Sequence, residues 1–295
     1  MSLRQWDVVV MNPPYQASSG NKGSNNILWD KFIEKAIDIT KKDGYVSAIH
    51  PSAWRNFFQN DTKKSHSNAG KKITSKQIKY LEIHGTEDGI KTFNCGTRYD
   101  WYILKNDIPK EKTLIIDQNG IQAELFLPNV KFIPNFMIER ILSLVAKDGE
   151  EKAEIICNSA YHTYNYNKNG TIEISKEKDD RCVYPVVNSV DTKNNPTLFY
   201  SSFNNKGHFG IPKIIFGNGA TGFFIDINGE YGLTQWSKAI VEKPNNLNCL
   251  AKALSSDDFK EIIKAIAITS YETNHFVLSS FRKDFWKEFV DEKSI

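Results

Sequence analysis

The first apolar stretch of the chain is short and rich in β-branched residues. Residues 7–11 read Asp-Val-Val-Val-Met, a pattern typical of a strand that is buried on both faces of a parallel sheet. Asn12-Pro13-Pro14-Tyr15 follows, and consecutive prolines end a strand because they lack backbone donors and fix φ. Since ligands bind at the carboxyl ends of strands in open α/β sheets, we expect a rigid loop at a functional edge.

The next two elements continue an α/β pattern. Residues 27–42 carry apolar side chains at helical spacing, and residues 45–51 form a strand-like run that ends at Pro51. Strand, helix and strand in this order predict a right-handed βαβ unit. Ser52 is expected to cap a further helix. The apolar positions of the first helix are Leu28, Phe32, Ile33, Ala36, Ile37 and Ile39.

The character of the chain changes after residue 107. Two more strand-like runs precede that point, and a boundary within residues 107–128 predicts one domain over 1–115 and a second over 116–295. The first is expected to be α/β and the second a mixed α+β domain. The further predicted elements are strands at 78–84 and 99–105, helices at 134–146 and 257–270, and a hairpin of residues 213–216 with 222–226.

Composition narrows the function only slightly. The net charge of +3 with 38 basic residues permits nucleic-acid binding without requiring it. The four cysteines lack C-x-x-C spacing and the six histidines lack metal-ligand spacing, so we expect neither a disulfide framework nor a metal site. His50, at a strand end beside Pro51, favours a structural role over a place in the site.

No feature of the sequence suggests a membrane protein. No apolar run approaches the ~20 residues that span a bilayer, and no signal-peptide pattern precedes Trp6. We therefore expect a cytoplasmic protein without a membrane partner.

The Asn12-to-Tyr15 loop after an apolar strand resembles the catalytic loop of the S-adenosylmethionine-dependent DNA amino-methyltransferases, in particular the adenine-N6 enzymes of restriction–modification systems. The resemblance implies a partial Rossmann-like methyltransferase sheet followed by a target-recognition, DNA-binding domain. The N6 amine of adenine is a poor nucleophile because its lone pair is delocalised into the ring. The Asn12 side-chain oxygen and the Pro13 carbonyl could accept its two N–H groups at ~2.9 Å and favour a pyramidal nitrogen.

Further residues take roles from the same resemblance. Pro14 stiffens the loop, and Tyr15 would stack on a base that has been flipped out of the duplex. A second aromatic residue, Phe93, is similar in position to the ring that stacks on the other face of the base, although a core phenylalanine would explain it equally well. Segment 155–235 interleaves aromatics with amides, as at Tyr161, which suits base reading or a packed core.

A basic stretch between residues 55 and 79 could face the phosphate backbone of DNA. A solvated surface loop explains this stretch equally well. The candidate DNA-binding residues are Lys63, Lys64, Lys71 and Lys72.

The family's cofactor pocket needs a glycine-rich turn after one strand and an acidic residue ending the next, and both lie before the catalytic loop in the class that this chain resembles. Residues 217–222 resemble such a turn superficially, but a strand-like run follows them, so we predict a hairpin. The S-adenosylmethionine pocket is thus expected to be incomplete in this chain. We expect double-stranded DNA as a partner, and either a complementing N-terminal half or self-association through the 7–11 edge strand.

Other functions remain open from the sequence. The chain could be a non-catalytic DNA-binding specificity module, or a methyltransferase that acts on RNA or on a protein amide. A nuclease is less favoured, because Glu150-Glu151-Lys152 lacks a preceding Pro-Asp strand end and reads better as a solvated charge cluster.

Overall fold

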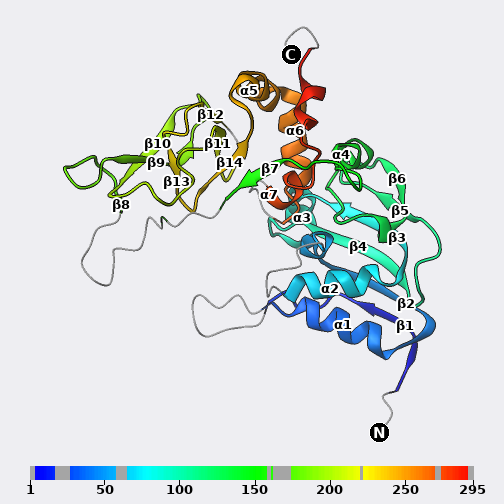
Figure 1. Ribbon diagram of the computed structural model, residues 1–295. Helices are drawn as coiled ribbons and strands as arrows, with labels where there is room; N and C mark the ends of the chain where they lie inside the picture. Colours follow the sequence, from blue (N-terminus) through cyan, green and yellow to red (C-terminus); the bar gives the residue numbers. More distant parts are fainter. Residues whose placement is uncertain are drawn as a thin grey trace. The chain divides into compact units, whose positions relative to one another are not determined.

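The computed structural model forms two compact units (Figure 1). The first comprises Met1–Leu142 and Ala267–Ser270, and the second comprises Ser143–Ile266 and Tyr271–Ile295. The division therefore lies later than the predicted boundary at residue 115, because two further strands extend the first sheet. The structure describes residues 4–16, 27–57, 65–157, 161, 174–219, 222–269 and 274–291.

The first unit contains a six-stranded sheet in the order β1-β2-β4-β3-β5-β6. β1 is parallel to β2, whereas β4 runs antiparallel between β2 and β3. This sheet is mixed, and with α1 between its parallel strands β1 and β2 it contains the predicted βαβ unit. The strands are β1 (Trp6–Met11), β2 (Thr40–Pro51), β3 (Gln77–His84), β4 (Tyr99–Lys105), β5 (Thr113–Ile116) and β6 (Gln122–Leu125).

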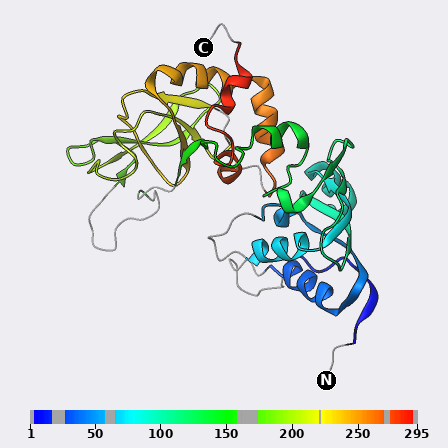
Figure 2. The same ribbon diagram turned by 45° about the vertical axis from the view of Figure 1, so that its right-hand side comes forward.

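Helix α1 (Trp29–Ile39) packs on β2 and on α2 (Ser65–Thr74), and α2 also contacts β3 (Figures 1 and 2). Ile33 and Ile37 of α1 join Val46 of β2 in the core. The first helix ends earlier than residue 42, because the extended backbone of β2 already begins at Thr40. The helix expected at Ser52 is only a short 3-10 turn, Ser52–Arg55.

β1 is the edge strand of this sheet, and its burial differs from the prediction. Val8 and Val10 are 56% and 76% exposed, while Val9 and Met11 pack on the core. The prediction of a strand buried on both faces was therefore wrong. Among the described residues, α1 and α2 cover only one of its faces.

A buried polar network joins the end of β2 to later segments of the first unit. The Arg55 guanidinium donates to Asp100 Oδ2 through Nε at 2.8 Å and to Asn135 Oδ1 at 2.8 Å. The Ser52 hydroxyl donates to the Ile268 carbonyl at 2.7 Å, and Asn135 donates to the Ala267 carbonyl at 3.0 Å. These bonds explain why residues 267–270 belong to the first unit.

The second unit has the mixed α+β arrangement that was predicted. It contains four-stranded sheets in the orders β13-β9-β10-β8 and β12-β11-β14-β7. The predicted hairpin is present, since β11 and β12 pair antiparallel. Its strands are β7 (Glu154–Ile156), β8 (Ile174–Ser175), β9 (Tyr184–Val190), β10 (Pro196–Ser201), β11 (Lys213–Gly217), β12 (Phe223–Asp226), β13 (Gly232–Leu233) and β14 (Ser237–Val241).

The remaining helices are shorter than the sequence pattern suggests. The helix predicted over 257–270 ends at Ile266, and the helix predicted over 134–146 spans Ile138–Leu144. None of the helices in the described part of the chain has the length and apolar character needed to cross a membrane. These helices are α3 (Thr86–Phe93), α4 (Ile138–Leu144), α5 (Leu247–Ser255), α6 (Asp257–Ile266) and α7 (His275–Leu278).

Candidate active site

The proline loop lies at the carboxyl end of β1, as the sequence predicts. Pro13 is buried, Tyr15 is half-buried, and Asn12 and Pro14 are exposed. The strand fixes the start of the loop and the buried proline ring fixes its course, because proline allows little variation in φ. The amide of Asn12 is therefore presented to solvent from a rigid backbone.

The end of the loop is attached to the start of α1. Leu28 N donates to the Tyr15 carbonyl at 3.2 Å, and Gln16 forms a β-bridge with Ile27. Trp29, the first residue of α1, stacks on the His50 ring with centroids 4.4 Å apart. The carboxyl ends of β1 and β2 thus meet the start of α1 at the carboxyl edge of the sheet.

Phe93 reaches this edge from α3. Its ring lies 6.4 Å from the Tyr15 ring, with an angle of 73° between their planes. The structure therefore brings together the two aromatic residues that the sequence proposed. A base stacked between two parallel rings needs roughly 7 Å between them, twice a carbon–carbon contact. The rings now contact each other edge to face, so a base could enter only after one ring turns away.

Three further residues surround Phe93 that the sequence analysis did not identify. The Tyr99 ring contacts Phe93 edge to face at 4.9 Å, and it stacks on His84 at 4.3 Å. Asp88 accepts hydrogen bonds from the Tyr99 hydroxyl and from His84 Nδ1, the latter at 2.9 Å. The i,i+4 spacing of His84 and Asp88 was the only feature of the sequence that could have indicated this cluster.

Burial and hydrogen bonding define the charges in this cluster. Burial and then the Asp88 carboxylate raise the pKa of Tyr99 to about 12. The Tyr99 hydrogen bond, followed by the nearby His84, lowers the pKa of Asp88. Burial also raises the pKa of Tyr15, whose hydroxyl is buried and has no hydrogen-bond partner among the described residues. At neutral pH a neutral phenol therefore donates to a charged carboxylate behind Phe93.

His50 belongs to the interior. It is fully buried, its Nε2 lies 3.0 Å from the Tyr102 hydroxyl, and its Nδ1 lies 3.0 Å from the Pro51 carbonyl. Burial lowers its pKa from 6.5 to about 4, so the ring is neutral. This environment agrees with the structural role that the sequence favoured.

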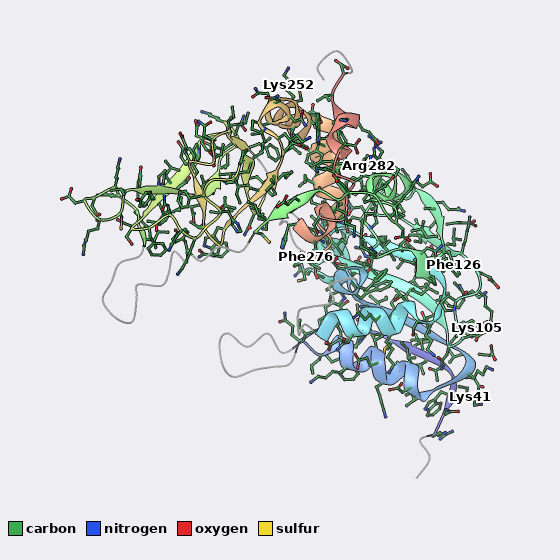
Figure 3. The ribbon with its side chains drawn as sticks, viewed as in Figure 1. Lys41, Lys105, Phe126, Lys252, Phe276 and Arg282 are labelled. Carbon is green, nitrogen blue, oxygen red and sulfur yellow. The ribbon has the colours of Figure 1, made fainter. Side chains whose placement is uncertain are left out.

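The structure does not bring the described candidate lysines to the loop. Lys71 and Lys72 lie in the last turn of α2, and Lys72 pairs with Asp38 at 2.7 Å. Lys72 lines a hollow with Gln5 and Thr40, at the end of the sheet where β1 and β2 begin. Lys41 and Lys105 lie at this same end of the sheet (Figure 3). Lys63 and Lys64 lie outside the described residues.

Tyr161 is not available to read a base. It is 1% exposed, and its hydroxyl donates to the Phe203 carbonyl at 2.7 Å, so its ring fills a core. The residues that follow it, 162–173, lie outside the described residues.

The stretch from Gly217 to Gly222 does not fit a cofactor cradle. It joins β11 to β12, which pair antiparallel, whereas a cofactor turn joins a strand to a helix. In the described part of the chain, no strand pairs with the outer edge of β1. The described residues of the proline loop offer hydrogen-bond acceptors at the carboxyl end of β1.

The comparison with known proteins agrees with the resemblance of the proline loop to that of methylases. Residues 2–86 match the family model of the Eco57I restriction-modification methylase. An "Uncharacterized adenine-specific methylase" of Mycoplasma pneumoniae is 33% identical over 88 residues, which are 28% of this chain and 19% of that protein. Residues 2–86 are thus similar to restriction-modification methylases. The resemblance seen in the Asn-Pro-Pro-Tyr loop is thereby confirmed, and the matched region spans about a fifth of that relative's length.

Two solved structures are similar over most of the chain. The type IIL restriction-modification enzyme MmeI, solved in complex with DNA, is 10% identical, covers 93% of this chain and 45% of its own, and has a TM-score of 0.42. The type IIG restriction endonuclease BpuSI is 9% identical, covers 97% of this chain and 49% of its own, and has a TM-score of 0.37.

Proposed function

We propose that this restriction-modification methylase chain carries the base-binding and DNA-recognition part of a DNA adenine-N6 methyltransferase. The observation that carries the proposal is the meeting of the proline loop with Phe93 at the carboxyl edge of the sheet. An exposed amide, a rigid backbone carbonyl and two aromatic rings are what a flipped adenine needs.

The loop acts on the nucleophile. The Asn12 side-chain oxygen and the Pro13 carbonyl accept the two N–H groups of the adenine amine, at ~2.9 Å. Two acceptors on one nitrogen favour a pyramidal geometry, which frees the lone pair for attack. Because the prolines hold the loop in place, little conformational entropy is lost when the base arrives. The amine proton leaves to water after the attack, so this chain supplies no general base.

The base enters between Tyr15 and Phe93. Stacking on aromatic side chains contributes about 1–3 kcal/mol per base, which offsets part of the energy of unstacking it from the duplex.

S-adenosylmethionine is the methyl donor that the family uses, and we propose that a complementing segment holds it. That segment would pair with the outer edge of β1. Beside that edge, Val8 and Val10 expose apolar surface on the open face of the sheet, as does Tyr45 on β2, which is 39% exposed and pairs with Val8. An exposed apolar edge strand is normally covered. The second unit would contact the recognition sequence.

Competition binding to single-stranded DNA tests the base pocket without knowledge of the target sequence. The probe is a thymine oligonucleotide with one central 8-vinyladenine, a fluorescent base that keeps the 6-amino group. Unlabelled competitors carry adenine, or purine without the amine, at that position. One hydrogen bond contributes about 0.5–1.5 kcal/mol, so adenine should compete roughly 3- to 10-fold better.

Asn12→Ala should weaken this preference, because only the Pro13 carbonyl is then left to accept, while leaving overall DNA affinity nearly intact. Gln5→Ala is the matched control, since it removes an exposed amide at the other end of β1. A preference that Asn12→Ala leaves unchanged would refute the assignment. Binding without any preference in the unmodified chain would favour the non-catalytic DNA-binding module.

A further inference from the structure

Phe93 is held in place by few contacts of its own helix. It is the last residue of α3, in which only Gly89 is buried, while Ile90 is 53% exposed. Gly89 lets the helix approach the next segment closely, because a Cβ there would lie 2.1 Å from the Thr97 carbonyl oxygen. A helix that buries so little apolar surface gains little from packing.

Asp88 attaches α3 to the sheet by hydrogen bonds, where apolar packing contributes little. Its carboxylate accepts the Tyr99 hydroxyl at the start of β4 and His84 Nδ1 at the end of β3. Tyr99 and His84 are paired across these two strands, and their rings stack with only 2° between the planes. One carboxylate therefore ties α3 to two strand ends.

The Tyr99 ring continues this attachment to Phe93. The two rings are in edge-to-face contact, and the Tyr99 hydroxyl lies 3.4 Å from Thr92 Oγ1, one residue before Phe93. Tyr99 is 5% exposed, so the ring has little freedom to move.

We propose that Asp88 is a positioning residue which, acting through Tyr99, fixes Phe93 as the rigid wall of the base pocket. This inference rests on the proposed function. The Tyr99 hydroxyl is bonded to Asp88 behind Phe93, so this hydrogen bond sets the position of the ring on which Phe93 rests.

The charges in the cluster support this arrangement. The lowered pKa of Asp88 and the raised pKa of Tyr99 keep an ionised acceptor against a neutral donor. Such charge-assisted hydrogen bonds are stronger than neutral ones.

The test uses the same 8-vinyladenine oligonucleotide with the full chain. Stacking on an aromatic ring quenches the probe, so the quench at saturation reports the pocket geometry, separately from affinity. Asp88→Ala should reduce the quench at least twofold with less than a twofold change in Kd. Asp88→Asn, which still offers Tyr99 an acceptor, should restore most of it. Glu82→Gln is the control, because Glu82 lies 3.6 Å from the other His84 nitrogen and accepts from the Tyr80 hydroxyl, whereas the Tyr99 hydroxyl donates to Asp88.

Hydrogen–deuterium exchange on the free chain gives a second measurement. Asp88→Ala should speed exchange of the α3 amides relative to the unmodified chain and to Glu82→Gln. If Phe93→Ala removes the quench and Asp88→Ala changes neither quench nor exchange, the positioning role is refuted and the base pocket stands. If Phe93→Ala and Asn12→Ala both leave the probe unchanged, the proposed function fails, and the exchange data alone decide whether Asp88 holds α3.

Discussion

Asn12 and His50 end neighbouring parallel strands and serve opposite purposes. Asn12 follows β1, the edge strand, and is exposed. His50 lies at the end of β2, one strand further in, where Trp29 covers its ring and Tyr102 bonds it. Residue type alone would have suggested the histidine as the reactive group. Position in the sheet decides otherwise, because only an exposed side chain can meet a substrate.

The burial of His50 predicts acid sensitivity of the first unit. Its folded pKa of about 4 lies below the ordinary value of 6.5, so the unfolded chain binds more protons between these values. The contribution of His50 to stability is complete above pH 6.5 and is lost as the pH falls towards 4. Between pH 7 and pH 5 this amounts to about 2 kcal/mol.

Urea unfolding at both pH values checks this. His50→Gln should show a smaller loss of stability between pH 7 and pH 5 than the unmodified chain. His208→Asn, which removes a histidine from the second unit, is the control. An unchanged loss in His50→Gln would contradict the argument.

At the scale of elements, β1 has one face on the core and one in solvent. The alternation of Val9 and Met11 with Val8 and Val10 is that of a half-buried strand. Because every residue from Val8 to Met11 is apolar, the solvent face of this strand carries apolar side chains. A further layer of protein on that face would bury them. We infer that a complementing segment pairs with the edge and covers this face, and that a second copy takes its place when this chain is alone.

Val10→Lys should therefore weaken self-association of the chain. The lysine puts a charge on a residue that is 76% exposed, so the melting temperature should change little. Sedimentation velocity over a range of concentrations measures the effect, with Ile108→Lys, at another exposed apolar residue, as the control. A chain that stays monomeric at high concentration with this edge open would count against the inference.

At the scale of the whole molecule, the two units divide the task that we propose. The first carries the proline loop and the aromatic cluster, and the second would read the DNA sequence. The chain matches only 19% of the methylase relative. The complete reaction is thus proposed to need residues that hold the methyl donor.

We predict that this chain alone binds S-adenosylmethionine weakly or not at all and transfers no methyl group. The reason is that the glycine-rich stretch from Gly217 to Gly222 joins two antiparallel strands. Isothermal titration with S-adenosylmethionine and a tritium-transfer assay on mixed-sequence DNA test this. Oligonucleotide binding by the same preparation confirms that the protein is folded. Micromolar affinity for the cofactor or robust turnover would overturn the prediction.

The local elements followed from the sequence. The strand ending at the prolines, the helix after it, the strands of β2 to β4 and the β11–β12 hairpin are set by periodicity, proline and glycine within a few residues. The resemblance of the loop to methylases lies in contiguous residues as well. Tyr15 and Phe93 could be named because the same resemblance supplies both.

Only the tertiary structure decided which residues meet. It placed β4 between β2 and β3, left Val8 and Val10 in solvent, and moved the unit boundary to Leu142. It also gathered Asp88, Tyr99 and His84 behind Phe93. Sheet order and long-range side-chain contacts depend on the packing free energy of the whole chain, which no local pattern contains.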